Sequence, residues 1–494
     1  MSGFAGEDTA AEAAGAAPRA RGEDVEMAAD DDSFIRPEDI AEEYDLGPGS
    51  ADEGGEMSDD EGAGEAELDG ADDATKGLPD VEDTALATFG GHFDSVYCVA
   101  VNPTRPAQFL TGGGDDRGFL WVVDAPASSG GGGASSGIVA DVRELSGHAD
   151  SVCAVGFSPD GALAATGAFD GRVLLWDATT GALKATLEGP DDVEWLCWHT
   201  RGNIVLAGSG DATVWMWMAT GGACMQVFAG HEAKVTCGMF TSNGKAVVTG
   251  SDDCSVRVWA PKTGECRHAF AGHGCHEGPV TCLAAHPDPD QPHLVLSGSE
   301  DGTAKLLHLQ SRRVLATLQH SGFDGSGGSD GSGFDLGGGG GAASGAAGAA
   351  MGAAAAGGGV GADAVGGVTS VEAVGFAASH PWAATGGVGG TAKVWDVATA
   401  RERHAFRHPA GVTKLRWHPT TPLLFTSCAD GIVRLWDART GSIAREYTGH
   451  RDMVLDFELC GAAGTSGAAA GAAPRWLVSV SDDHTAKVFD IGDI

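Results

Sequence analysis

Positive charge is scarce in this sequence of 494 residues. It holds 30 lysines and arginines against 69 aspartates and glutamates, which gives a formal net charge of −39 at pH 7. A protein that binds nucleic acid through its phosphates needs a basic face, and so does one that adheres to an anionic membrane surface. The shortage therefore excludes direct nucleic-acid binding and favours a basic protein or peptide as the partner.

Long apolar runs and paired cysteines are also missing. No stretch of 18 apolar residues could cross a bilayer, so we expect no membrane insertion. The acidic start MSGFAGEDTA lacks the pattern of a signal peptide. The 11 cysteines include no C-x-x-C pair. We therefore expect reduced thiols in a protein of the cytoplasm, with the nucleus as a further location.

Tryptophan is absent from the first part of the chain. Residues 1–83 hold 28 acidic and four basic residues, and all 12 tryptophans follow residue 120. Such a composition cannot bury enough apolar area to offset the entropy of ordering it. We predict a disordered acidic N-terminal tail over 1–83 and one folded domain over 84–494. Low-complexity stretches at 128–137, 320–367 and 461–475 indicate flexible inserts in that domain.

A unit recurs eight times in the folded part. Each complete copy has a His, preceded by Gly in all but the His408 copy, a Val four residues after the His, a Thr, and an Asp followed six residues later by Trp. Four copies hold the whole set: His92, Thr111, Asp115 and Trp121; His148, Thr166, Asp170 and Trp176; His231, Thr249, Asp253 and Trp259; His408, Thr426, Asp430 and Trp436.

The other four copies are incomplete. Those that begin at His276 and His450 end at Leu307 and Phe489 in place of Trp. The third copy has Gly189 and Ala207 where the His and the Thr/Ser belong, and the sixth has Gly367 and Gly389 where the His and the Asp belong. Without the inserts, 338 residues remain, about 42 for each of eight copies.

These residues resemble the WD repeat, in which each copy forms one blade of a propeller. The resemblance implies an all-β, eight-bladed WD-repeat β-propeller, with His, Ser/Thr, Asp and Trp joined by hydrogen bonds within a blade. A buried polar network stabilises a fold only when nearly all of its donors and acceptors form hydrogen bonds. We therefore expect the four blades with the complete residue set to be the stiffest. The strand at 84–89 precedes the first copy, and we expect it to complete the last sheet and so close the ring.

No catalytic or metal-binding pattern stands out. H-E-x-x-H does not occur, and the G-x-S-x-G matches at 133–137 and 327–331 lie in the low-complexity stretches and are no nucleophile elbow. Most histidines are explained by their repeat position. The cluster His273, Cys275 and His276 lacks the second ligand pair of a closed zinc site. We predict a protein that is not an enzyme and has no cofactor and no metal.

Acidic residues recur at equivalent loop positions of different copies. In propellers, the loops that enter the innermost strand and the residue before the turn Asp line one face of the ring. Mapped on this repeat, these positions define what we call the acidic face: Asp94, Asp150, Glu194, Asp252, Glu300, Glu372, Asp452 and Asp482. A converging set of carboxylates attracts a basic peptide. The alternative is that they only keep an acidic protein soluble.

One stretch indicates a different partner. Residues 424–439, LFTSCADGIVRLWDAR, resemble the extended WD-x-R box through which some propellers dock to the adaptor of cullin-4 ubiquitin ligases. The docking residues would be Asp430, Arg434, Asp437 and Arg439. A substrate receptor of such a ligase is the alternative function. Arg439 could instead pair with carboxylates at the edge of its own blade.

Several stretches resemble a narrower group. They are DVEWLCWH (192–199), GPVTC (278–282), DGIVRLWDARTG (430–441) and DHTAKVF (483–489), and they resemble the angio-associated migratory cell protein family. The resemblance implies a non-catalytic acidic propeller in the cytoplasm, and we expect it to be a monomer. In the fungal branch of that family it implies a dedicated chaperone for a basic large-subunit ribosomal protein, in ribosome biogenesis. The animal branch is associated with cell migration, which suggests a signalling scaffold. The residues themselves give the acidic face and the tail, but not the client.

Overall fold

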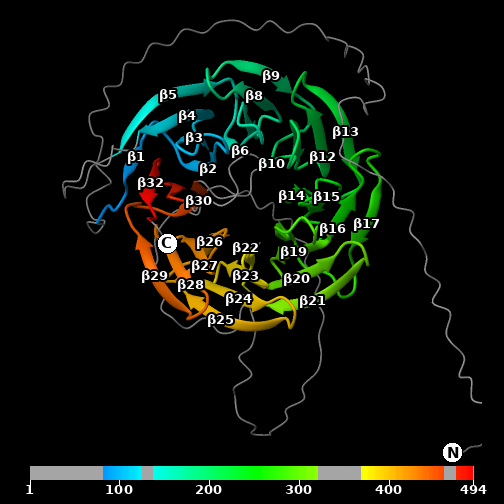
Figure 1. Ribbon diagram of the computed structural model, residues 1–494. Helices are drawn as coiled ribbons and strands as arrows, with labels where there is room; N and C mark the ends of the chain where they lie inside the picture. Colours follow the sequence, from blue (N-terminus) through cyan, green and yellow to red (C-terminus); the bar gives the residue numbers. More distant parts are fainter. Residues whose placement is uncertain (1–81, 125–136, 321–368, 461–473, 493–494) are drawn as a thin grey trace, which may run out of the picture.

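The chain folds as a closed ring of sheets. The computed structural model describes residues 82–124, 137–320, 369–460 and 474–492. There the chain forms 32 strands in eight four-stranded antiparallel sheets (Figure 1). The prediction of an all-β, eight-bladed propeller is confirmed. Within the described ranges, no helix is long and apolar enough to cross a membrane.

Most of the predicted tail and inserts lie outside the described residues. This holds for 1–81 of the tail and for the insert predictions 128–137, 320–367 and 461–475, apart from Gly137, His320, Pro474 and Arg475 at their ends.

Each blade runs from an innermost to an outermost strand. Blade one consists of β2 (Val96–Val101), β3 (Gln108–Gly113), β4 (Arg117–Asp124) and β5 (Ile138–Ser146), and blade two of β6 (Val152–Phe157), β7 (Leu163–Ala168), β8 (Val173–Asp177) and β9 (Leu183–Leu187). Blade three consists of β10 (Trp195–Trp198), β11 (Ile204–Gly208), β12 (Thr213–Met218) and β13 (Ala223–Ala229). Blade four consists of β14 (Cys237–Phe240), β15 (Val247–Gly250), β16 (Val256–Trp259) and β17 (Cys266–Phe270).

Blades five to seven follow the same order. Blade five consists of β18 (Val280–Ala285), β19 (Leu294–Ser299), β20 (Thr303–His308) and β21 (Arg313–Gln319). Blade six consists of β22 (Val371–Phe376), β23 (Trp382–Gly387), β24 (Thr391–Asp396) and β25 (Arg401–Arg407). Blade seven consists of β26 (Val412–Trp417), β27 (Leu423–Cys428), β28 (Val433–Asp437) and β29 (Ser442–Tyr447). Blade eight consists of β30 (Val454–Cys460), β31 (Trp476–Ser481), β32 (Ala486–Asp490) and, as its outermost strand, β1 (Ala87–Phe89).

Apolar side chains fill the space between neighbouring blades. The second strands are buried on both faces, as in β31, where all six residues of WLVSVS are buried. Leu110 and Leu120 of blade one pack with Ala164 and Trp176 of blade two in one core cluster. A sheet buried on both sides reads as a continuous apolar run rather than an alternating one. Each blade therefore depends on both of its neighbours.

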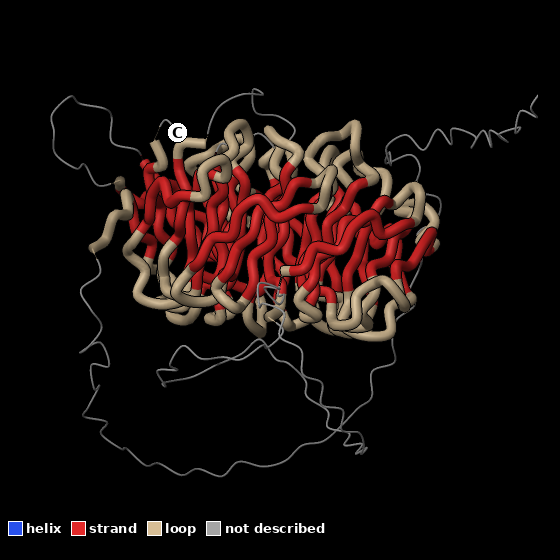
Figure 2. The backbone as a smooth tube through the Cα atoms, turned by 90° about the horizontal axis from the view of Figure 1, so that it is seen from below, coloured by secondary structure: helices blue, strands red, loops and turns tan. Residues whose placement is uncertain are grey.

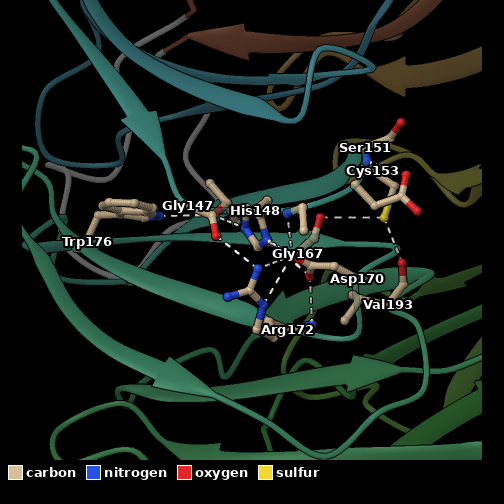
Figure 3. Close-up of polar contacts among 12 residues, drawn as sticks. Gly147, His148, Ser151, Cys153, Gly167, Asp170, Arg172, Trp176 and Val193 are labelled. Atoms are coloured by element: carbon tan, nitrogen blue, oxygen red, sulfur yellow. Dashed lines mark hydrogen bonds and ion pairs between the residues drawn. The ribbon is translucent and has the colours of Figure 1, made fainter. Parts of the chain in front are cut away.

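Hydrogen bonds also join the blades near the ring centre. A side chain one or two residues after the repeat Val of one inner strand donates to the carbonyl of the repeat Val in the next blade. The donors are Cys98 to Val152 (3.7 Å), Cys153 to Val193 (2.7 Å), Trp195 to Val235 (2.9 Å), Thr236 to Val280, Thr281 to Val371 and Thr413 to Val454 (2.7 Å). Figure 3 shows the Cys153 bond. Burial raises the pKa of Cys153, so its thiol keeps the proton that it donates.

Trp195 adapts the third blade, one of the incomplete copies. Besides donating to Val235, its indole lies against Gly208 of its own blade and Gly238 of the next, where a Cβ atom would overlap the ring. The large side chain thus fills the joint between blades three and four, and it requires glycine on both sides.

Ring closure joins the two ends of the folded domain. Three residues of β1 pair with β32, with Ala87 opposite Val488 and Phe89 opposite Ala486. Lys487 pairs with Asp83 at 2.5 Å, and the Phe89 ring stacks on Trp121 of blade one at 5.0 Å. The prediction that the strand at 84–89 completes the last sheet is confirmed.

Truncating the closing strand should destabilise the whole ring. We expect Phe89→Ala to lower the free energy of unfolding by about 3–5 kcal/mol, because a buried aromatic ring is lost between two blades. Urea denaturation followed by tryptophan fluorescence measures it. The control is Leu183→Ala, at an outer-strand position that is 52% exposed, with an expected cost under about 1 kcal/mol. Equal costs for the two variants would contradict this account of closure.

Candidate functional site

The loops that carry the acidic face share one end of the ring. Strands of each blade alternate in direction, so the loop before the inner strand and the turn between the second and third strands emerge at the same end. Figure 2 shows the ring edge-on, with strands in the middle and loops gathered at its two ends. The carboxylates of the acidic face therefore come from loops that open to one side.

A side-chain hydrogen-bond chain holds those loops in blades two and four. In blade two, His148 Nδ1 lies 3.1 Å from the Asp170 carboxylate and its Nε2 lies 2.8 Å from Thr166 Oγ1, which also accepts the indole N–H of Trp176 at 2.9 Å (Figure 3). In blade four, the same chain runs through His231, Asp253, Thr249 and Trp259. These two copies are complete.

The chain is interrupted in the other two copies that hold the whole residue set. In blade one, His92 contacts Asp115 and Thr111, but the buried indole nitrogen of Trp121 has no partner. The prediction that the Trp121 indole donates a hydrogen bond to Thr111 is therefore wrong. The Trp121 ring stacks on Phe89 instead.

Blade seven departs at the Asp. His408 and Trp436 both reach Thr426, but His408 Nδ1 has no partner. Asp430 is bound by Arg434, with 2.6 Å between Nη2 and Oδ2. The prediction of a hydrogen bond between His408 and Asp430 is therefore wrong. The buried guanidinium of Arg434 binds the Asp430 carboxylate more strongly than a neutral imidazole would.

Among the incomplete copies, blades five and eight keep the polar part of the chain. His276 lies 3.0 Å from Asp301 and 2.8 Å from Ser297, and His450 repeats this with Asp483 and Ser479. In blade three, which has Gly189 at the His position, Asp192 holds the turn by accepting from Ser209 Oγ at 3.1 Å and from the Gly210 amide.

Blade six has a histidine that the sequence spacing concealed. His320, at the end of β21, is buried and lies 2.8 Å from Thr385, which also accepts from Trp395 at 2.9 Å. The assignment of Gly367 to the His position is therefore wrong. Residues 321–370 separate His320 from the repeat Val371, so a search for a His four residues before the Val misses it.

The histidines differ in their titration because their partners differ. Burial, with Arg434 nearby, lowers the pKa of His408 to about 4, and burial with Lys393 lowers the pKa of His320 to about 4. Hydrogen bonds from Ser255 and His231 lower the pKa of Asp253 to about 2, against the opposing effect of burial. Blades six and seven therefore hold neutral imidazoles, whereas the carboxylate in blade four stays charged.

Three carboxylates of the acidic face lie around one tyrosine. Burial, followed by the carboxylates of Asp94, Asp482 and Asp150, raises the pKa of Tyr97 on inner strand β2. Burial also raises the pKa of Asp482, with Asp452 adding to the shift. These carboxylates come from blades eight, one and two, so the structure brings Asp94, Asp150, Asp452 and Asp482 together.

The other half spans blades three to six. Burial, then Glu372 and Asp252, raise the pKa of Glu300. Burial raises the pKa of Glu194, although its ion pair with Lys234 at 2.5 Å opposes the shift. Because neighbouring carboxylates repel one another, they are stabilised by any cation that enters between them. Lys234 is the one basic side chain that pairs with this face among the described residues.

Three further residues lie at this end of the ring that the repeat pattern did not predict as part of it. Phe93 is 76% exposed, Tyr97 lies among the carboxylates, and burial with Asp150 and Asp115 raises the pKa of Asp116. The stretch FDSVY (93–97) could have predicted the two aromatic residues, because Phe93 and Tyr97 lie on either side of Asp94 in the sequence. They add apolar contact area to a charged surface.

The docking-box residues are divided between interior and surface. Arg434 is buried, and it pairs with both Asp430 and Glu446. The side chain of Arg439 is 63% exposed and pairs with Asp437 at 2.9 Å. Arg434 therefore stabilises its own blade, and only the Arg439–Asp437 pair is presented to a partner.

Other candidate chemistry is sparse in the described ranges. No group of three or more His, Cys, Asp or Glu side chains there could hold a metal ion. A cavity of about 340 Å³ lies at the far ends of inner strands β18, β22, β26 and β30, lined by Leu283, Phe376 and Trp417 with Arg416 and Glu458. No residue of the acidic face lines it.

Comparison with known proteins places the repeat in a family. The family described as "WD domain, G-beta repeat" matches residues 83–121, 140–177, 181–218, 222–260, 264–307, 364–396 and 401–437. Angio-associated migratory cell protein of Homo sapiens is 33% identical over 407 residues, which cover 82% of this chain and 80% of that protein. An uncharacterised WD repeat-containing protein of Schizosaccharomyces pombe is 29% identical over 419 residues, covering 83% and 87%.

Solved structures share the fold. Sqt1 of Saccharomyces cerevisiae superposes with a TM-score of 0.65 at 22% identity, covering 83% of this chain and 100% of that one. Sqt1 of Chaetomium thermophilum, solved bound to the N-terminus of the ribosomal protein L10, superposes with a TM-score of 0.63 at 22% identity and the same coverage.

His408 should make stability sensitive to mild acid. Its folded pKa lies below the unfolded value of 6.5, so the unfolded chain binds a proton that the folded chain does not. Stability therefore falls as pH drops from 6.5 towards 4, by up to about 1.4 kcal/mol per pH unit. His408→Gln should reduce this loss, measured as unfolding free energies at pH 7 and pH 4.5. Exposed His273 supplies the control, since His273→Gln should leave the loss as it is. An unchanged loss in His408→Gln would contradict the assignment.

Proposed function

Because the chain belongs to the WD-repeat family, and within it to the family of angio-associated migratory cell protein, we propose that it is a non-catalytic chaperone that binds a basic client on its acidic face. The client would be the basic N-terminal segment of a large-subunit ribosomal protein, bound in the cytoplasm before assembly into the ribosome.

The crowding of carboxylates around one end of the ring carries this proposal. Seven of the eight blades contribute to the acidic face, and blade seven is the exception. The raised pKa values of Glu194, Glu300 and Asp482 have a common cause in burial and neighbouring acids. Carboxylates kept only for solubility would be dispersed and solvated, whereas these are crowded with one paired lysine. Lys and Arg side chains of a client would relieve the repulsion.

Aromatic groups at the same end suit a peptide rather than a free cation. Phe93 is exposed beside Asp94, and Tyr97 lies among the carboxylates of blades eight, one and two. Aromatic faces bind the stems and charged heads of Lys and Arg. The shared fold of Sqt1, whose Chaetomium thermophilum form was solved bound to the N-terminus of the ribosomal protein L10, supports a client of this kind.

The ligase-receptor alternative stays a prediction. It would depend on Arg439, since the Arg434 guanidinium is held by Asp430 and Glu446 inside blade seven. Association with a ligase adaptor that is lost in Arg439→Ala would favour it. The scaffold role in cell migration and the monomeric state are likewise predictions.

Charge reversal on the acidic face should abolish client binding. We expect the fourfold variant Glu194→Lys, Asp252→Lys, Glu300→Lys and Glu372→Lys to weaken binding of an N-terminal ribosomal protein L10 peptide at least a hundredfold. Binding by the unaltered chain should weaken steeply between 50 and 500 mM salt, because part of the interaction is screened. Fluorescence anisotropy with a labelled peptide measures both effects.

The matched control changes the same total charge elsewhere. Asp124→Lys, Glu144→Lys, Glu265→Lys and Asp290→Lys replace four exposed carboxylates that are not part of the acidic face. We expect at most a few-fold loss from this control. Equal losses in the two fourfold variants would show that net charge alone attracts the peptide, and unchanged binding in the first would overturn the proposed site.

A further inference from the structure

The outer rim of blades five to seven is basic, although the protein as a whole is strongly acidic. Their outer strands β21, β25 and β29 follow one another along the circumference of the ring (Figure 1). On these strands and the turn before β21 lie six exposed arginines, which we call the arginine belt: Arg312, Arg313, Arg401, Arg403, Arg407 and Arg445.

The belt has almost no countercharge of its own. The three strands contain two carboxylates, Glu402 and Glu446. Glu402 pairs with Lys393 at 2.9 Å, and Glu446 pairs with Arg434 at 2.9 Å. Each carboxylate thus forms its ion pair with a basic residue of the neighbouring strand and not with an arginine of the belt. Within the described part of the chain, Arg313, Arg401 and Arg407 form no ion pair.

The outer strands on the opposite side of the ring differ. Arg143 of β5 pairs with Asp141 at 2.8 Å, and Lys184 of β9 pairs with Asp177 at 3.1 Å. Basic residues on those two strands are thus neutralised locally. A general need to protect exposed sheet edges with charge would not produce this difference between the two sides.

The segment that precedes the propeller reaches the structure beside the belt. Thr448 follows β29 directly, and its hydroxyl donates to the Glu82 carbonyl at 2.7 Å. The Thr84 amide donates to the Thr448 carbonyl at 2.9 Å. Glu82 therefore contacts Thr448, which lies three residues along the chain from Arg445, a span of about 10 Å. Residues 1–81 end at this point.

Charge and length make residues 1–81 a fitting occupant. They hold 26 acidic and four basic residues, a net charge of −22. A coil of 81 residues has a root-mean-square length of about 50 Å, close to the diameter of a 400-residue domain. The covalent connection also gives this segment a high effective concentration at the belt.

We propose that the acidic segment 1–81 docks on the arginine belt of blades five to seven. Docking neutralises the belt with carboxylates from the same chain. It also keeps the segment on the rim, away from the acidic face, so that the segment does not compete with that face for a basic client. This inference does not require the client to be a ribosomal protein.

Site-specific photocrosslinking in the full chain tests the docking without any client. Leu315 lies on β21 within the belt and is 51% exposed, and Leu183 lies on β9 and is 52% exposed, so the two positions are matched. The photoreactive residue p-benzoylphenylalanine replaces one or the other. Crosslinks to peptides of 1–81 are counted by mass spectrometry in dilute protein.

We expect at least tenfold more crosslinks to 1–81 from position 315 than from position 183. Arg312→Glu, Arg313→Glu and Arg401→Glu together should remove that excess, and 0.5 M salt should remove most of it in the otherwise unaltered chain. The salt titration keeps the test valid should the triple variant not fold.

Three outcomes would overturn the proposal. They are equal yields at the two positions, an excess that survives both charge reversal and salt, and crosslinks that rise with protein concentration and join different molecules. Preferential crosslinking of position 315 to an added single-stranded RNA, with no crosslinks to 1–81, would assign the belt to nucleic acid instead.

Discussion

Closure of the ring is the constraint on which the rest of this structure depends. Each blade is a sheet with two apolar faces, so it is stable only between two neighbours, and eight blades satisfy one another only if the last meets the first. Three residues of β1 make that junction by completing the sheet of β30, β31 and β32. Phe89 carries the apolar part of the seam by stacking on Trp121, and Lys487 with Asp83 carries the polar part.

The acidic face exists because the closed ring fixes where its loops begin. His–Asp contacts hold the turns in five of the blades, and blade three uses Asp192 for the same purpose. In blade seven, Asp430 pairs with Arg434 instead, His408 Nδ1 has no partner, and burial with Arg434 nearby lowers the pKa of His408 to about 4. The turns therefore stay in place while the individual bonds vary, which lets carboxylates from seven blades converge without any two being close in sequence.

The ring separates opposite charges on its surface. Carboxylates gather at one end, where burial and mutual repulsion raise several pKa values. Exposed arginines line the rim of blades five to seven, and three of them, Arg313, Arg401 and Arg407, form no ion pair within the described residues. Both sets are made by repetition, because equivalent positions of successive blades form continuous stripes. A strongly acidic chain can in this way present one surface that attracts cations and another that attracts anions.

By itself, the sequence determined the class of fold and the number of blades. The repeat spacing is a local property, and the apolar runs, turns and Gly-His starts that it records fold the same way in every copy. It also predicted, by repeat position, an acidic face of carboxylates on loops at one end of the ring. Only the tertiary structure decided which side chains bond. Trp121 stacks on Phe89 and its indole nitrogen has no partner, and Asp430 pairs with Arg434 instead of His408. His320 contacts Thr385 although 50 residues separate it from the repeat Val371. The belt was hidden for the same reason: whether an arginine is paired depends on the neighbouring strand and the next blade, which sequence spacing does not record.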